Sequence, residues 1–126
     1  MSYKTDYQAV AGLGSAKDGT SHWVSQRITA IALVPLGMAF LYPLMKSLGE
    51  SHETVLATYS HPFHALTAIG FFIVAFRHLR LGMQEVIVDY IHTERMLMIT
   101  LIANAIIWRG IAIAGAFAVA KIALGA

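Results

Sequence analysis

Three long apolar segments divide the chain, and short polar stretches separate them. The first runs from about Ile28 to Leu48, the second from about Phe63 to Tyr90, and the third from about Met96 to Leu124. Because an α-helix rises about 1.5 Å per residue, about 20 apolar residues cross the hydrocarbon core of a bilayer. The pattern therefore predicts an all-α integral membrane protein, a single domain 1–126 with transmembrane helices over about residues 27–48, 62–90 and 95–124.

The polar stretches predict the connections between these helices. Residues 1–22 form a polar N-terminal segment whose glycines do not stand in the Gly-Lys-Ser/Thr order of a phosphate loop, so we expect a flexible membrane-proximal segment. Residues 50–59 are polar, and a short interfacial helix is expected there. Pro62 suits the first turn of the second helix. Pro35 and Pro43 fall inside the first helix, where a membrane protein tolerates them because neighbours satisfy the freed carbonyls.

The composition supports a chain that faces lipid. Of its residues 57% are hydrophobic and only 13% are charged, whereas about 25% charge is usual in a soluble domain. The net charge is only +2, so nothing indicates a nucleic-acid-binding face. Cysteine is absent, which excludes disulfides, cysteine-ligated zinc and cysteine-ligated iron–sulfur clusters within the chain.

The basic residues predict the orientation in the membrane. The odd number of spans places the two termini on opposite sides. One side would carry Lys4, Lys17, Arg27, Arg77, Arg80 and Arg95, and the other Lys46 and Lys121. The positive-inside bias then makes the N-terminus cytoplasmic. The N-terminal residues have no apolar segment of the signal-peptide kind, so we expect a multi-pass protein of a bacterial inner membrane, inserted through its own helices.

His78 is the main candidate for chemistry, because a titratable side chain inside a membrane helix is costly. Gly82 lies one turn further along and leaves room for a flat macrocycle, and Asp89 shares the same face about 16 Å away. A neutral imidazole is a good axial ligand of heme iron. A histidine that only hydrogen-bonds a neighbouring helix explains the position equally well. His61 and His64 lie at the helix start, where interfacial solvation is the simpler explanation.

Three further positions have both an ordinary and a functional interpretation. Asp89 and Tyr90 suit a helix end in the aromatic belt, or a hydrogen-bond donor for a carbonyl ligand with an acid beside it. Arg27 suits a positive-inside anchor, or a charge partner for carboxylates such as heme propionates. Arg109 lies deep in the third span, so we expect it to face a protein interior and an acid or carbonyl partner.

The spacing of His78, Gly82, Asp89 and Tyr90 resembles the second-helix signature of the small hydrophobic membrane-anchor subunits of succinate dehydrogenase (complex II). In that family a glycine follows the histidine by four residues, and Asp-Tyr follows it by eleven and twelve. The segment Arg27-Ile28-Thr29-Ala30 resembles the family's Arg-x-Thr-Ala at the opening of the first helix. The resemblance covers roughly residues 22–121, and the three-helix plan agrees with it.

The resemblance implies a role for each matched residue. His78 would be one axial ligand of a heme b, and the other would come from the companion subunit, which is of the cytochrome b556 type. Tyr90 would hydrogen-bond ubiquinone with Asp89 in support, and Arg27 would lie near the heme propionates or the quinone. The flavoprotein and iron–sulfur subunits would dock on the cytoplasmic face and oxidise succinate, so that this chain is a noncatalytic anchor.

Some features depart from the family pattern, and two other functions stay open. Arg77 and Arg80 make the surroundings of His78 more basic than the family pattern, and Arg109 has no counterpart in it. The alternatives are the anchor of a fumarate reductase, which runs the same chemistry in reverse, and a cofactor-free membrane assembly or transport component in which His78 only packs.

Overall fold

The computed structural model describes Thr5 and residues 18–125, and within this part the chain forms four helices. These are α2 (Asp18–Ser47), α3 (His52–Ser60), α4 (Pro62–Tyr90) and α5 (Glu94–Ala123). Three of them, α2 from Thr20 onward, α4 and α5, are long and apolar enough to cross a membrane. The predicted class, an all-α membrane protein with three transmembrane helices, is confirmed. Most of the expected polar N-terminal segment, with Lys4 and Lys17, lies outside the described residues.

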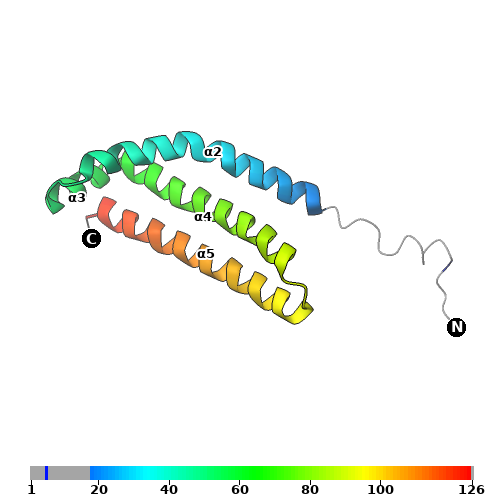
Figure 1. Cartoon of the computed structure of the whole chain (residues 1–126). Coiled ribbons are helices and arrows are strands. Elements are labelled where there is room, and N and C mark those ends of the chain that lie inside the picture. Colours follow the sequence, from blue (N-terminus) through cyan, green and yellow to red (C-terminus); the bar gives the residue numbers. More distant parts are fainter. Residues whose placement is uncertain (1–4, 6–17, 126) are drawn as a thin grey trace.

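The three long helices run up, down and up, with α4 between the other two (Figure 1). Helix α4 packs against both α2 and α5, whereas those two make no contact with each other in the described part of the chain. The start of α2 and the connection from α4 to α5 lie at one end of the molecule, and α3 and the C-terminus lie at the other (Figure 1). The helices thus form an open layer rather than a closed bundle.

Helix α2 begins at Asp18, whereas the apolar pattern alone places the membrane helix from about residue 27. The additional turns are polar in sequence, yet His22 and Gln26 of these turns lie against α4. Contacts with a neighbouring helix therefore continue α2 beyond its apolar run, which a window of hydrophobicity does not detect.

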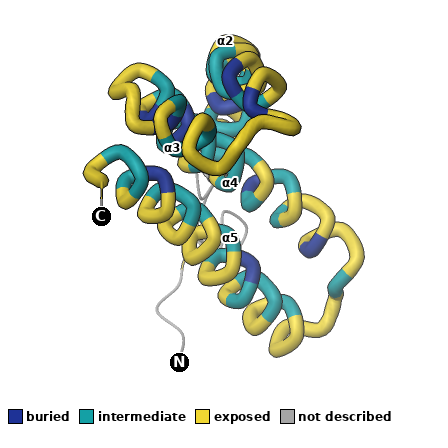
Figure 2. Tube along the Cα trace, turned by 90° about the vertical axis from the view of Figure 1, so that its left-hand side faces the viewer, coloured by how far each residue is buried: buried dark blue, intermediate teal, exposed yellow. Residues whose placement is uncertain are grey.

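The best-buried part of the molecule lies where α3 crosses the ends of the long helices. Tyr59, Ala65, Ala68 and Val119 form a small buried cluster there, and Figure 2 shows how few other positions are buried. Ala68 has no exposed surface, since its small side chain lets the helices approach closely. Burial also raises the pKa of the Tyr59 hydroxyl, which therefore stays neutral at physiological pH.

Aromatic side chains join α4 to both of its neighbours. Phe71 stacks on Phe40 of α2 with ring centroids 4.4 Å apart, and Phe76 stacks on Trp108 of α5 at 5.9 Å. Such stacked pairs add about 0.5–1.5 kcal/mol beyond the area that they bury. They fix the level at which each helix meets α4.

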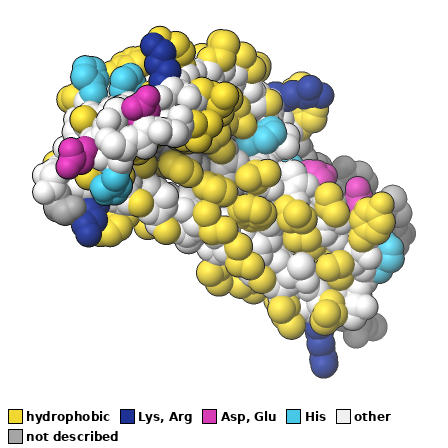
Figure 3. Space-filling model, turned by 60° about the vertical axis from the view of Figure 1, so that its left-hand side comes forward, with side chains coloured by type: hydrophobic (Ala, Val, Ile, Leu, Met, Phe, Trp, Pro, Cys, Tyr) yellow, Lys and Arg dark blue, Asp and Glu magenta, His cyan; other side chains and the backbone are white. Residues whose placement is uncertain are grey.

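Most large apolar side chains point outward. Among the many exposed positions, Ile31 of α2, Leu66 of α4 and Ile113 of α5 have exposed fractions of 72%, 69% and 70%. Figure 3 shows apolar side chains covering the middle of one face, with charged and histidine side chains gathered toward the two ends. Large exposed apolar surfaces mark contacts with a membrane or a partner protein. We therefore expect lipid, a second subunit or both to cover these side chains.

The turns before α4 follow local rules. Ser51 caps α3 through a hydrogen bond from the Thr54 backbone N–H at 3.3 Å. Pro62 occupies the first turn of α4, as predicted, and the ring of His61 accepts a hydrogen bond from the Phe63 N–H. The Nδ1–H of His64 donates to the Thr58 carbonyl at 3.0 Å, so this half-buried histidine holds the α3–α4 corner rather than only meeting interfacial water.

The fit of α5 against α4 predicts a glycine-specific effect. A Cβ at Gly115 would lie 3.0 Å from the ring of Phe72, whereas a Cβ at Gly110 would meet nothing within 4 Å. We therefore expect Gly115→Leu to destabilise the folded protein by about 1–3 kcal/mol through overpacking, and Gly110→Leu to leave it unchanged or more stable. The midpoint of thermal unfolding in detergent measures both, and equal midpoints for the two variants would contradict this packing.

Candidate functional site

Three contacts made by polar side chains of α2, two of them hydrogen-bonded or ionic, join the first half of α2 to the second half of α4. From the membrane interior outward, Thr29 meets His78, Gln26 lies against Gly82, and His22 meets Glu85. Residues 22, 26 and 29 are four and three apart, as are residues 78, 82 and 85, so each set occupies one face of its helix. We call these three contacts the α2–α4 polar line.

His78 is held by one of its two ring nitrogens. The Thr29 Oγ1 atom lies 2.9 Å from His78 Nδ1, and it also lies 2.9 Å from the Ser25 carbonyl and 3.0 Å from that of Gln26. A hydroxyl has one proton, and threonines within helices commonly donate it to the carbonyl one turn back. Thr29 therefore accepts a hydrogen bond from the Nδ1–H of His78, and this assignment leaves the lone pair on Nε2.

The Nε2 atom of His78 is free to bind. In the described part of the chain it has no hydrogen-bond partner, and it does not belong to the buried polar atoms that lack one, so it is accessible from outside. A hydrogen bond on one ring nitrogen that orients the other is the usual arrangement of metal-ligating histidines. No group of three or more His, Asp or Glu side chains that could hold a metal ion forms within residues 18–125.

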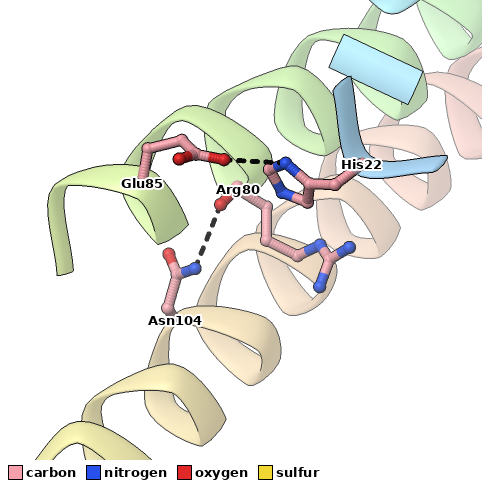
Figure 4. Close-up of polar contacts among 4 residues, drawn as sticks. All are labelled: His22, Arg80, Glu85 and Asn104. Atoms are coloured by element: carbon pink, nitrogen blue, oxygen red, sulfur yellow. Dashed lines mark hydrogen bonds and ion pairs between the residues drawn. The ribbon is translucent and has the colours of Figure 1, made fainter. Parts of the chain in front are cut away.

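The rest of the α2–α4 polar line extends away from His78 toward the end of the molecule. A Cβ at Gly82 would lie 3.5 Å from the Gln26 Nε2 atom, so the space that this glycine leaves faces α2. Further out, His22 Nδ1 lies 2.8 Å from Glu85 Oε1 (Figure 4). Because the Glu85 side chain is 62% exposed, this pair contributes at most about 1 kcal/mol to stability.

A cationic hollow of about 880 Å³ lies beside this line, between α2 and α4. Arg27, Arg77 and Arg80 line it, and Arg27 also packs over the ring of Trp23 at 5.3 Å. Three guanidinium groups make a site that attracts carboxylates or phosphates, which they bind through paired hydrogen bonds.

Asp89 and Tyr90 lie apart from this hollow. Both are exposed at the C-terminal end of α4, with Tyr90 81% exposed, and neither lines the cationic hollow. The described chain therefore brings Arg27, Arg77 and Arg80 together around the cationic hollow and holds His78 through Thr29, while Asp89 and Tyr90 lie exposed at the end of α4.

The interior partner expected for Arg109 is not found within residues 18–125, and whether another chain provides one stays untested. The Arg109 side chain is exposed, and within residues 18–125 it pairs with no carboxylate; instead it lines a groove between α4 and α5 together with Arg77 and Arg80. At the same level Asn104 of α5 donates from Nδ2 to the Arg80 carbonyl at 3.1 Å (Figure 4). The physical reason is that the helix layer is open on this side, so no protein interior surrounds the arginine.

Reasoning from the sequence gave no role to three residues of the polar line, namely His22, Gln26 and Thr29. Their spacing at intervals of four and three is a signal that could have found them, because it matches the stripe on α4. The pairing was not visible because two of the three lie before the apolar run.

Comparisons with known proteins identify the family of the chain. Residues 1–118 match the family model described as the succinate dehydrogenase/fumarate reductase transmembrane subunit. The chain is 34% identical over 126 residues to the succinate dehydrogenase hydrophobic membrane anchor subunit of Paracoccus denitrificans, covering 100% of this chain and 97% of that protein. It is 31% identical over 94 residues to the subunit of the same name from Rickettsia bellii (strain RML369-C), covering 75% of each chain.

A more distant relative extends the same relationship, and the solved structures add nothing to it. The succinate dehydrogenase membrane anchor subunit of Reclinomonas americana is 27% identical over 88 residues, covering 68% of this chain and 73% of that protein. No solved structure shows a significant match. The resemblance first seen in the spacing of His78, Gly82, Asp89 and Tyr90 is thus confirmed at the level of the family. On the family model and these identities, the chain belongs to the succinate dehydrogenase/fumarate reductase transmembrane subunits.

Proposed function

We propose that this chain anchors a succinate dehydrogenase in the membrane and supplies His78 as one axial ligand of a heme b shared with a companion subunit. The observation that carries the proposal is the state of the imidazole, whose Nδ1–H is bound to Thr29 while Nε2 is accessible and without a partner. The relatives from Paracoccus, Rickettsia and Reclinomonas are named for succinate dehydrogenase, which favours this direction over fumarate reductase.

The residues present fit one side of a heme. A heme b carries one electron at a time and binds two axial ligands, of which this chain offers one. This chain offers His78, and we propose that the second ligand would come from a companion subunit of the cytochrome b556 type. Thr29 orients the ring and makes the imidazole a better donor through the hydrogen bond on Nδ1.

Arg27 is proposed to stabilise the heme propionates. It lines the cationic hollow with Arg77 and Arg80, near the level of Thr29 and His78 on the same pair of helices. Propionate carboxylates suit guanidinium groups because each pair forms charge-assisted hydrogen bonds.

Tyr90 and Asp89 are proposed to contribute to a ubiquinone site. The Tyr90 hydroxyl is a donor that suits a quinone carbonyl, and the adjacent Asp89 carboxylate places an acceptor beside it. Because both side chains are exposed, the pocket would be completed by a partner, for which we propose the companion and iron–sulfur subunits at this end of the molecule.

The end of the molecule that carries the start of α2 and the α4–α5 connection also supports a proposal for the orientation of the chain in its membrane. The basic residues near the start of α2 and the α4–α5 connection favour a cytoplasmic position, where the iron–sulfur and flavoprotein subunits would dock and oxidise succinate. We propose a bacterial inner membrane, as the relatives from Paracoccus and Rickettsia suggest.

Loss of the ligand tests the heme assignment directly. We expect His78→Leu to abolish or strongly weaken the b-type absorbance of the purified complex, because no other histidine near it can replace the lone pair. His92→Leu removes an exposed histidine beyond α4 and serves as the control. If the unaltered complex shows no b-type absorbance, the chain is instead a cofactor-free assembly component.

Loss of the hydrogen bond to His78 tests the role of Thr29. We expect Thr29→Val to lower heme affinity roughly tenfold or more, since removing such a partner of a ligating histidine typically costs 10–100-fold. Thr29→Ser keeps the hydroxyl and should retain heme as the unaltered protein does. The heme content of the assembled complex is measured at successive dilutions for each variant. If Thr29→Val and Thr29→Ser lose heme equally, the hydrogen bond from His78 to Thr29 does not determine heme affinity.

The quinone assignment predicts a separation of two activities. We expect Tyr90→Phe to lower electron transfer from succinate to ubiquinone roughly tenfold, because one hydrogen bond of about 1.4 kcal/mol is lost. Oxidation of succinate by an artificial acceptor should persist, since that reaction does not require this site. Tyr42→Phe alters an exposed tyrosine at the opposite end and is the matched control. Unchanged ubiquinone kinetics in Tyr90→Phe would remove Tyr90 from the site.

A further inference from the structure

A second hollow, on the other side of α4, has a lining that is apolar along its length and cationic at one end. This groove of about 610 Å³ lies between α4 and α5. Ile69 and Ile73 of α4 and Ala116 and Phe117 of α5 belong to its apolar walls. The cationic end of the groove is formed by Arg77, Arg80 and Arg109. The stacked rings of Phe76 and Trp108 lie beside these arginines.

The three arginines have no anionic partner of their own. Within residues 18–125 the one ion pair is that of His22 with Glu85, and it does not involve them. Like charges that share a site in low dielectric repel one another, so the cluster requires an anion from outside the chain. A groove that joins apolar walls to a cluster of guanidinium groups fits an anionic amphiphile.

The depth of the cluster fits a lipid headgroup. The Asn104–Arg80 hydrogen bond and the Phe76–Trp108 stack place the arginines of α4 and α5 near one level. The Thr29–His78 contact places Arg27 near that level too, immediately before the apolar run of α2 begins at Ile28. Arg80 thus lies near the boundary of the hydrocarbon core. Arg109 lies about one turn deeper, beside Trp108, and its long side chain can extend toward the same phosphate.

The length of the groove fits one leaflet. From Arg80 to Ile69 the groove follows eleven residues of α4, about 16 Å at the helical rise. Half of a hydrocarbon core of about 30 Å is about 15 Å. An acyl chain that begins at a phosphate on the arginines would therefore end near Ile69 and the bilayer midplane.

We propose that this groove binds one anionic phospholipid, with its phosphate on Arg80 and Arg109 and one acyl chain along the apolar walls. Arg80 also lines the cationic hollow on the side of α2, whereas Arg109 and the apolar walls belong only to the groove on the side of α5. The inference does not depend on the heme or quinone assignments. It also gives Arg109 the partner that the protein does not provide.

The experiment uses the intact complex, purified in mild detergent and exchanged into nanodiscs that hold equal amounts of phosphatidylglycerol and phosphatidylcholine. Native mass spectrometry then counts the phospholipids that remain bound. Arg109→Gln removes the guanidinium that lines this groove and not the cationic hollow, and Ala116→Trp fills the apolar wall without changing charge. Arg95→Gln and Ala114→Trp are matched controls, because both residues are exposed on α5 outside the groove.

We expect one phosphatidylglycerol to be retained in preference to phosphatidylcholine, and Arg109→Gln to lower that retention roughly tenfold through the loss of charge-assisted hydrogen bonds. Ala116→Trp should displace the lipid, and both controls should retain it. Equal retention of the two lipids, or an equal effect of Arg95→Gln, would overturn the proposal.

Two further results would show that the groove binds something other than a whole phospholipid. If glycerophosphate, which has no acyl chains, competes as well as whole phosphatidylglycerol, the site binds phosphate alone and the acyl chain assignment is wrong. If Arg109→Gln releases the companion subunit from the complex while lipid retention is unchanged, the anion is an acidic side chain of that subunit. Subunit ratios on a gel, measured beside lipid retention, show which of the variants remain assembled.

Discussion

Helix α4 is the element on which the rest of the chain depends, because it contacts both α2 and α5 while those two do not meet. Its aromatic side chains stack on both neighbours, and its small residues let α3 and α5 approach at the far end. In a bilayer there is no hydrophobic force between helices, so close packing and hydrogen bonds have to hold them together. The consequence is an open layer in which one central helix presents different chemistry on its two sides.

The polar contacts of α4 differ between its side toward α2 and its side toward α5. On the side of α2, the hydroxyl of Thr29 satisfies His78, and His22 pairs with Glu85 further out. On the side of α5, Asn104 holds the Arg80 carbonyl, and the arginines open onto an apolar groove. Each of these contacts satisfies only part of a polar side chain, since Gln26 Oε1 and Asn104 Oδ1 are buried without a partner in the described residues. For the arginines we propose an anion from the surroundings.

Several functional side chains and apolar surfaces of this chain are left exposed for contact with other molecules. The chain offers the imidazole of His78, an exposed tyrosine and carboxylate, and large apolar surfaces without a cover. Membership of the transmembrane-subunit family gives the physical context, since proteins of this kind fold beside other chains and within lipid.

The sequence by itself determined the class of fold, the three spans and the family, because apolar runs of membrane length and the spacing of His78, Gly82, Asp89 and Tyr90 are local properties of the chain. It also marked His78 and Arg109 as unusual, because charge or titratable chemistry inside an apolar run is visible without coordinates. The tertiary structure alone decided their partners. Thr29 lies 49 residues from His78, and Arg80 lies near Arg109 through the α4–α5 packing, so neither pairing is encoded in local periodicity. Likewise, only the packing of α5 on α4 shows that Arg109 lines a groove between these helices.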